Sequence, residues 1–184
     1  MALLHPIIYF AIILIELVFV IFLASYLLSL IYSTIMGSPY VPIRRKKIRE
    51  ILKEADLKQN KKFIDIGCGD GRVVKEAVQT FNVKGTGIDI NPIILYKAKF
   101  ISKINKIKNI KYLRQNIFDT DLKNYDYIYL FLMPKFIDKL SSKLKLALNN
   151  GSTIISYGFK ITYLSKYLKK KVYDISFPTY IYKK

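Results

Sequence analysis

The sequence predicts an α/β domain with a mostly parallel sheet, preceded by a transmembrane helix. Two observations support the domain: strand patterns alternate with helical patterns, and the chain ends in two strand patterns with no helix between them. The third observation is an apolar run of 25 residues, 7–31, that contains one charge. We therefore expect an anchor over residues 1–36 and one domain of ordinary size over residues 37–184.

The apolar run is long enough to cross a bilayer. As a helix it would measure roughly 37 Å, against about 30 Å for a hydrocarbon core. A secretory signal would need a basic start and a shorter apolar stretch, and a helix that is apolar all round is difficult to bury in so small a domain. Glu16 is the charge within the run. An intramembrane acid is costly and often functional, but Glu16 could also be protonated, and the sequence leaves both open.

The charge distribution predicts the orientation of this helix. Residues 1–43 contain no Lys or Arg, whereas residues 44–184 carry a net charge of +19. The basic residues Arg44, Arg45, Lys46, Lys47 and Arg49 directly follow the helix. By the positive-inside rule, the protein is single-pass, with its N-terminus outside and its domain in the cytoplasm. Membrane lipid is then a partner of the helix.

After a hinge at Gly37, Ser38 and Pro39, the elements of the domain follow from hydrophobic periodicity. Helical spacing is found in residues 48–55, 73–78, 94–104 and 137–147. Strand patterns occupy residues 62–66, 84–90, 110–114, 125–132 and 153–157. Residues 171–177 and 179–183 are separated only by Pro178 and predict an antiparallel hairpin at the edge of the sheet.

A glycine-rich loop links the first strand to the next helix, in the sequence Asp65-Ile-Gly67-Cys-Gly69-Asp-Gly71. A dinucleotide-binding loop would have glycine at position 72, which is Arg, and a P-loop would have Gly-Lys-Ser/Thr. Asp65 could face a cationic group. Asp89 lies 20 residues after Gly69, at the end of the second strand, where an acid binds ribose hydroxyls. A ligand with a ribose, a positive amino group and no pyrophosphate fits: S-adenosylmethionine.

This loop, with Gly87-Ile-Asp89-Ile-Asn91-Pro92, resembles the first two motifs of class I (Rossmann-like) methyltransferases, over residues 40–184. The resemblance implies a Rossmann-like seven-stranded sheet, mostly parallel with a C-terminal antiparallel hairpin. It also implies that Gly67, Gly69 and Gly71 contact the methionine part of the cofactor and that Asp89 holds the ribose. Asn116 and Ile117 stand at the adenine position, where the family commonly has Asp.

Several acceptor chemistries are excluded or disfavoured. Methylation of a pyrimidine C5 uses a cysteine nucleophile, but the single cysteine, Cys68, lies in the cofactor loop. Methylation of an adenine amine or a glutamine amide uses an amide or acid after the fourth strand, where this chain has Phe131-Leu-Met133-Pro134. With one histidine, one cysteine and no clustered acids, we expect no metal. A lysine amine needs only alignment and desolvation.

A second resemblance points to lysine. Pro39-Tyr40-Val41-Pro42, followed by a basic helix and later by Leu130 to Pro134, is similar to a small group of protein-lysine methyltransferases. The group includes archaeal broad-specificity enzymes and membrane-anchored mitochondrial enzymes that modify an ATP synthase proteolipid or the adenine nucleotide carrier. It implies a protein substrate with an accessible lysine, and that substrate could be membrane-associated. This chain departs from the mitochondrial members in having Asp89 for Glu and Asn116 for Asp.

Three residues are candidates for the site of the methyl acceptor. Tyr40, Met133 and Pro134 are predicted to form the walls of a channel to the sulfonium methyl group; alternatively, Tyr40 sits at the membrane interface.

Other functions stay open. An RNA methyltransferase would use the basic surface to bind phosphates, but the same lysines could simply be solvated near an anionic leaflet. Nucleic acid is therefore the disfavoured partner. A non-catalytic membrane adaptor with a relic cofactor site, or methylation of a small molecule or lipid, stays open.

Overall fold

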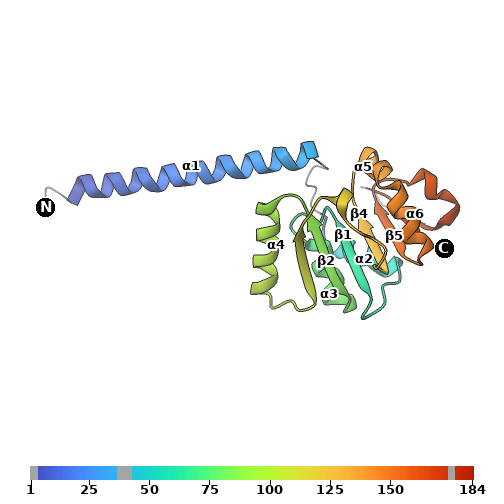
Figure 1. Cartoon of the computed structure of the whole chain (residues 1–184). Helices are drawn as coiled ribbons and strands as arrows, with labels where there is room; N and C mark the ends of the chain where they lie inside the picture. Colours follow the sequence, from blue (N-terminus) through green and yellow to red (C-terminus); the bar gives the residue numbers. More distant parts are fainter. Residues whose placement is uncertain (1–3, 37–42, 174–176) are drawn as a thin grey trace.

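A computed structural model describes residues 4–36, 43–173 and 177–184 (Figure 1). Its sheet has seven strands in the order β3-β2-β1-β4-β5-β7-β6. The strands are β1 (Lys62–Ile66), β2 (Lys84–Asp89), β3 (Ile110–Arg114), β4 (Tyr127–Leu130), β5 (Thr153–Tyr157), β6 (Leu168–Val172) and β7 (Thr179–Tyr182). Strands β1 to β5 pair in parallel with one another, and β7 pairs antiparallel with β5 and β6. The predicted fold class is confirmed.

Helices cover both faces of the sheet. The elements outside the sheet are α1 (Leu4–Met36), α2 (Arg45–Glu54), α3 (Arg72–Phe81), α4 (Pro92–Ile104), η1 (Ile117–Asp119), α5 (Pro134–Lys139), α6 (Ser141–Asn149) and η2 (Thr162–Tyr167). Because side chains alternate along a strand, Phe63 of β1 packs with α2, α3 and α4, whereas Ile64 and Ile66 pack with α5 and α6. The central strands are therefore buried on both sides, as parallel strands usually are.

Several element boundaries differ from the prediction, and four of the differences have a structural reason. Residues 137–147 form two helices, because the backbone N–H of Leu140 donates to both Phe136 and Ile137 and tightens the turn between them. The second strand stops at Asp89, and β4 is confined to residues 127–130, since Phe131 and Leu132 already belong to the connection to α5. Strand β6 begins at Leu168, before the predicted start at Lys171. The sequence pattern missed this start because an edge strand exposes its lysines and shows no apolar alternation.

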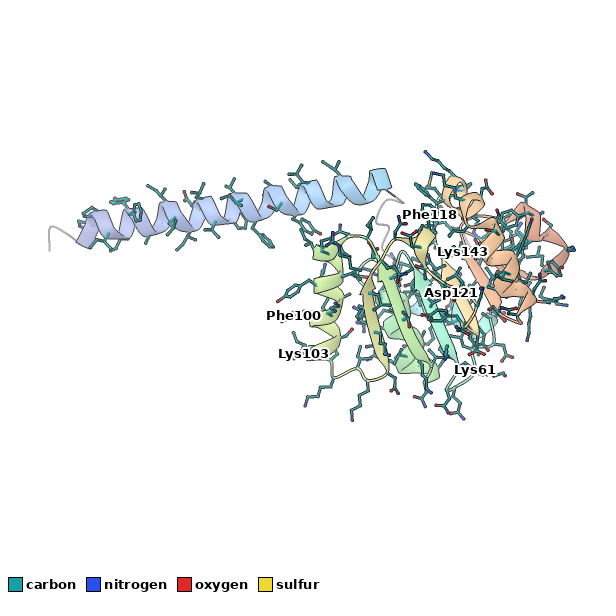
Figure 2. All side chains as sticks on the ribbon, in the orientation of Figure 1. Lys61, Phe100, Lys103, Phe118, Asp121 and Lys143 are labelled. Atoms are coloured by element: carbon teal, nitrogen blue, oxygen red, sulfur yellow. The ribbon has the colours of Figure 1, made fainter. Side chains whose placement is uncertain are left out.

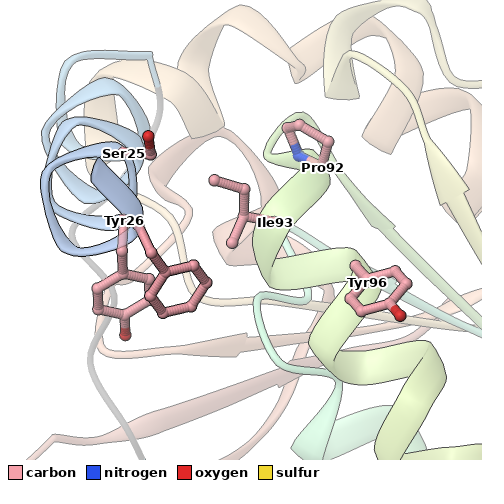
Figure 3. A pocket seen from close by; sticks show the side chains of 6 residues that line it. Ser25, Tyr26, Pro92, Ile93 and Tyr96 are labelled. Carbon is pink, nitrogen blue, oxygen red and sulfur yellow. The ribbon is translucent and has the colours of Figure 1, made fainter. Parts of the chain in front are cut away.

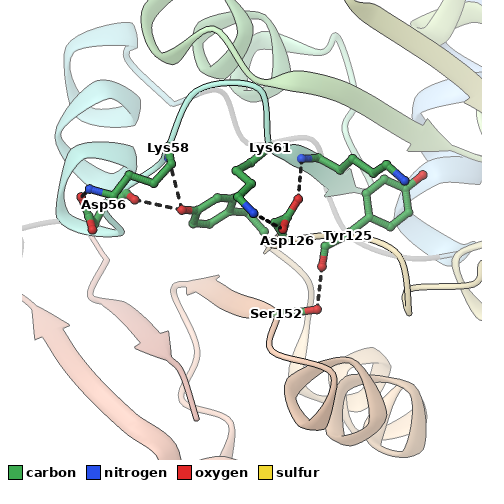
Figure 4. A network of polar contacts seen from close by, with 8 residues as sticks. Asp56, Lys58, Lys61, Tyr125, Asp126 and Ser152 are labelled. Atoms are coloured by element: carbon green, nitrogen blue, oxygen red, sulfur yellow. Dashed lines mark hydrogen bonds and ion pairs between the residues drawn. The ribbon is translucent and has the colours of Figure 1, made fainter.

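Polar contacts close the amino-terminal edge of the sheet (Figure 4). The Tyr127 hydroxyl donates to the Asp56 carbonyl (2.9 Å) and accepts from the Lys58 backbone N–H (3.2 Å). Asp126 accepts from the Lys62 backbone N–H (2.8 Å) and from Lys61 Nζ (3.2 Å). These contacts join the ends of β1 and β4 to the α2–β1 connection. The carboxyl edge, where open α/β folds bind ligands, carries the glycine loop.

Helix α1 has 33 residues and projects from the domain on the side where α4 lies (Figure 1). Its segment His5–Leu28 is long and apolar enough to cross a membrane, by length and composition alone, and none of it is buried in the protein. As a helix that segment measures about 36 Å. The predicted hinge at residues 37–39 and Tyr40 lie outside the described residues.

Candidate functional site

The glycine loop turns sharply between β1 and α3. Gly67, Gly69 and Gly71 have φ values of +76°, +52° and +71°, in the left-handed region that favours glycine. The backbone N–H groups of Gly67 and Cys68 donate to the Ile88 carbonyl of β2, at 2.9 and 2.8 Å. The loop therefore lies against the end of β2, next to Asp89.

Asp89 fastens this loop to the start of α4. One carboxylate oxygen accepts from the Gly69 backbone N–H and the other from the Asn91 backbone N–H, both at 2.9 Å. Burial raises the pKa of Asp89, while the backbone donors at Asn91, Gly69 and Ile90 oppose the increase. Each carboxylate oxygen can accept further hydrogen bonds, because an ionised carboxylate has about four acceptor positions.

Asp65 carries an unpaired buried oxygen. Its side chain is 2% exposed and Oδ2 has no hydrogen-bond partner. Burial raises the pKa of Asp65 well above the usual value, and the nearby charges of Asp89 and Asp70 add to the increase, opposed by the Val74 backbone N–H. A buried acceptor without a donor costs free energy. A cationic hydrogen-bond donor would satisfy it.

Cys68, between the glycines, does not have the properties of a nucleophile. It is buried, and its thiol donates weakly to the Gly69 carbonyl at 3.7 Å. Burial raises the pKa of the thiol well above its ordinary value, and the charges of Asp65, Asp89 and Asp70 act in the same direction. The thiolate is the reactive form, so this environment supports the exclusion of cysteine-dependent methylation.

An aromatic cluster lies at the carboxyl ends of β4 and β5. The ring of Phe131 is 4.8 Å from that of Tyr157 and 5.6 Å from that of Phe177, centroid to centroid, and Tyr157 and Phe177 are 5.8 Å apart. Gly158 makes room for it: a Cβ there would be 2.9 Å from Phe131 Cε2. Its N–H donates to the Pro178 carbonyl at 2.8 Å, which ties β5 to the segment before β7. We call Phe131, Tyr157 and Phe177 the aromatic cluster.

Comparisons with known proteins identify this arrangement. A family model described as the ANTKMT methyltransferase domain matches residues 65–167. The chain belongs to this methyltransferase family. A protein-lysine N-methyltransferase of Saccharolobus islandicus (strain REY15A) is 32% identical over 125 residues, which cover 67% of this chain and 78% of that protein. The predicted resemblance to class I methyltransferases and to protein-lysine methyltransferases is confirmed.

Other relatives match a smaller share of their length. A lysine N-methyltransferase of the ATP synthase c-subunit, from Caenorhabditis elegans, is 36% identical over 56% of this chain and 60% of that protein. Among solved structures, an RNA methyltransferase from Salinibacter ruber in complex with S-adenosyl-L-homocysteine has a TM-score of 0.70 and 24% identity, covering 77% of this chain and 92% of that one. At that identity the likeness shows the fold.

This chain is an S-adenosylmethionine-dependent methyltransferase, and its residues fit that cofactor. The unpaired Oδ2 of Asp65 suits the ammonium group of the methionine part, and the glycine loop lets a ligand approach its backbone. The remaining acceptor capacity of Asp89 suits a ribose hydroxyl. Bound there, the cofactor supplies an electrophilic methyl group on a sulfonium.

The residues predicted to contact adenine follow β3. Asn116 is exposed, and its side-chain oxygen accepts from the Phe118 backbone N–H at 3.0 Å, which caps η1. The side-chain N–H2 then suits an adenine acceptor nitrogen. Ile117 is half-buried against the core beneath α5 and α6, where it could offer an apolar contact to the base. These two assignments remain predictions.

The structure brings some predicted site residues together and adds others. Gly69 of the loop contacts Asp89 directly, and Asp65 lies near enough for the charge of Asp89 to raise its pKa. Met133 and Pro134 lie at the start of α5 and are exposed. Tyr157 and Phe177 were not predicted from the sequence. An aromatic residue before a glycine at a strand end is a weak signal for Tyr157, and none pointed to Phe177.

Proposed function

We propose that this methyltransferase transfers a methyl group to a lysine amine of a protein and that α1 holds it at a membrane. The single observation that supports lysine most is the relationship to enzymes named as lysine N-methyltransferases, at 32% and 36% identity. Two of the substrates named among the relatives, the ATP synthase c-subunit and the adenine nucleotide translocase, make a membrane-associated acceptor a specific hypothesis for this chain.

The reaction needs little from the protein beyond alignment. A neutral lysine amine attacks the methyl carbon; a C–N bond forms while the C–S bond breaks and its electron pair goes to sulfur. The product ammonium then loses a proton to water. Residues 131–134 and 157–159, at the ends of β4 and β5, contain no acid or histidine. The neutral amine is therefore favoured by desolvation among apolar side chains, not by a general base.

The acceptor would enter along the aromatic cluster, with Met133 and Pro134 on one side of the entrance. Tyr40 is proposed for the other side. A described contact supports this: Arg72, at the start of α3, donates from Nη1 to the carbonyl of Ile43 at 3.1 Å and forms an ion pair with Asp70 of the glycine loop. Tyr40 is three residues from Ile43, so the chain keeps it within about 10 Å of that anchored point.

Substitution of Tyr40 tests the channel. In the chain lacking residues 1–35, Tyr40→Ala should leave cofactor affinity within a few-fold but lower transfer to a lysine-rich test protein by about 10–100-fold, through misalignment. Tyr173→Ala is the matched control, since Tyr173 is 78% exposed near the hairpin. Unchanged transfer in the Tyr40 variant would instead place this tyrosine at the membrane interface.

The cofactor assignment has its own test. Gly69→Val would fill space needed by the methionine part, and Asp89→Ala would remove the ribose acceptor together with the contact to Gly69. Either should weaken binding of S-adenosylmethionine at least tenfold, about 1.4 kcal/mol or more, in calorimetry. Unchanged affinity in both would reject this part of the site.

The acceptor class can be read directly by methylating a membrane fraction with labelled cofactor. Label on lysine in mass spectrometry supports the proposal; label in ribonuclease-sensitive material supports the RNA alternative. The basic residues favour protein, because they do not form one stripe toward the cofactor site: exposed lysines occur on α4, α6 and β6, and so on both faces and one edge of the sheet (Figure 2).

The proposed topology places the N-terminus outside and the domain in the cytoplasm. An Ala2→Cys variant should react with an impermeant thiol reagent in intact cells, and a Lys184→Cys variant only after permeabilisation. Native Cys68 is buried and should contribute little background. The opposite labelling pattern would reverse the orientation, and equal labelling of both would argue against a crossing.

A further inference from the structure

Helix α4 has two apolar faces. One packs on the sheet through Ile94, Leu95 and Ala98, which are at most 5% exposed. The other is a stripe on the outer side: Ile93, Tyr96, Phe100 and Ile104 are 37%, 71%, 54% and 62% exposed. The spacing of three, four and four residues keeps these side chains on one line of the helix. The rings of Tyr96 and Phe100 stack, with centroids 6.4 Å apart. We call these four residues the α4 stripe.

Basic residues flank the α4 stripe. Lys97, Lys99 and Lys103 are exposed on the same helix, which contains no acid. Figure 2 shows Phe100 and Lys103 extending from α4 away from the sheet. Aromatic and aliphatic side chains bordered by lysines are typical of helices that lie in the boundary between lipid headgroups and acyl chains. Anionic headgroups complement the lysine charges.

The α4 stripe begins beside α1. Phe22, Ser25 and Tyr26 of α1 and Pro92, Ile93 and Tyr96 of α4 line a cavity of about 310 Å³ between the two helices (Figure 3). Ser25 and Tyr26 lie near the end of His5–Leu28, the segment long enough to cross a membrane. The rest of that segment extends beyond the domain on the α4 side (Figure 1). A bilayer around it would thus have its surface at the level of Ile93 and Tyr96.

We propose that the α4 stripe docks the domain onto the surface of an anionic bilayer. Ile93, Tyr96, Phe100 and Ile104 enter the headgroup boundary, and the three lysines contact the anionic headgroups. This inference rests on the proposed anchoring by α1 and adds a second contact, which fixes the domain's orientation at the membrane. The partner is a lipid surface and not a protein groove, because the stripe is a convex helix face with one sign of charge.

The chain has no tryptophan, so a single introduced tryptophan reports without background. The full chain would be reconstituted in phosphatidylcholine vesicles with roughly 30% phosphatidylserine, with or without bromine on the acyl chains. Three variants serve: Tyr96→Trp in the α4 stripe, Phe19→Trp in the middle of the α1 segment, and Tyr173→Trp as the matched exposed aromatic near the hairpin. Bromine quenches the emission of tryptophan that contacts acyl chains.

Quenching of Tyr96→Trp and Phe19→Trp, but not of Tyr173→Trp, is expected. Quenching of Phe19→Trp alone would overturn the docking of α4 while leaving the anchor intact, and would make the stripe available to a protein partner. Quenching of neither would overturn both the docking and the membrane anchoring. Quenching of Tyr96→Trp without Phe19→Trp would support the docking and reject the anchor.

The lysines supply a second readout. Replacing Lys97, Lys99 and Lys103 with Gln in the Tyr96→Trp chain should lower the docked-to-undocked ratio about fivefold per lysine. The matching change at the far edge is Lys169, Lys170 and Lys171 to Gln on β6, which should have little effect. Omission of phosphatidylserine should imitate the α4 variant. Equal quenching in all of these would show that the charge does not hold the stripe at the surface.

Discussion

The substitution Gly71→Ala tests the packing behind the glycine loop. A Cβ on Gly71 would lie 2.5 Å from Cε1 and from the hydroxyl oxygen of Tyr112, a contact that real Cβ atoms do not make. The ring cannot easily retreat, because Tyr112 is 8% exposed and its hydroxyl forms a hydrogen bond with Ser102 at 3.0 Å. In addition, the φ of +71° strains any residue with a Cβ.

The two costs have separate magnitudes. The left-handed backbone costs about 1–2 kcal/mol for alanine. Overpacking against a held ring adds about 1–3 kcal/mol. Gly151→Ala is the matched control: Gly151 has a φ of +91°, but a Cβ added there would have no atom within 4 Å, so it carries only the first cost. The free energy of unfolding should therefore fall about 1–3 kcal/mol further in Gly71→Ala than in Gly151→Ala.

Urea unfolding of the chain in detergent, followed by near-ultraviolet circular dichroism, measures both variants. A double-mutant cycle with Tyr112→Leu isolates the contact, because removal of the outer ring atoms should reduce the cost of Gly71→Ala to that of Gly151→Ala. Equal destabilisation in the two glycine variants, or an unchanged cost of Gly71→Ala in the Tyr112→Leu background, would refute the reasoning.

Further predictions concern Asp65, Cys68 and Gly158. Burial raises the pKa of Asp65 in the folded protein, so the folded chain holds a proton that the unfolded chain loses near pH 4. Without cofactor, the free energy of unfolding should therefore fall as the pH rises from about 4 through the folded pKa. Asp65→Asn should flatten this pH dependence in unfolding curves. Over the same range, calorimetry should show S-adenosylmethionine binding more tightly as Asp65 ionises; affinity independent of pH would separate Asp65 from the ammonium group. Cys68 should react with a thiol reagent much more slowly in the native chain than in urea, as its buried environment raises the pKa of the thiol, and equal rates would contradict that burial. Gly158→Ala should displace Phe131 and lower methyl transfer about 10–100-fold with cofactor affinity within a few-fold; unchanged transfer would remove the aromatic cluster from the acceptor path.

Much of the fold could be predicted because it depends on local patterns. The spacing of apolar residues located β1 and β5 to the residue, and it placed α2 and α3 within a few residues of their ends. The boundaries failed where local signal is weak. Strand β6 begins at Leu168 because Leu168 and Lys170 pair with β7, and an edge strand exposes its lysines. Likewise, Ile104 lies at the end of the helical spacing predicted for residues 94–104, but it is 62% exposed.

The sequence marks the residues proposed to bind the cofactor, whereas it does not mark the aromatic cluster proposed for the acceptor. The loop glycines and Asp89 are marked by residue types that a sharp turn and a ribose require, at spacings set by one strand–helix–strand unit. The aromatic cluster joins residues 131, 157 and 177, none of which forms a motif within its own segment. These positions are brought together by the order of strands β4, β5 and β7.

The sequence by itself determined the layered α/β architecture, the cofactor loop and the apolar helix, since each follows from short-range periodicity or from a motif within one unit of the chain. Only the tertiary structure decided which groups are buried together. It placed the carboxyl group of Asp65 near Asp89 with an unpaired oxygen, Tyr112 behind Gly71, and the α4 stripe beside α1. The physical reason is that burial, electrostatic coupling and exposed apolar surface depend on distances between segments far apart in the chain, and the fold of the whole sheet sets those distances.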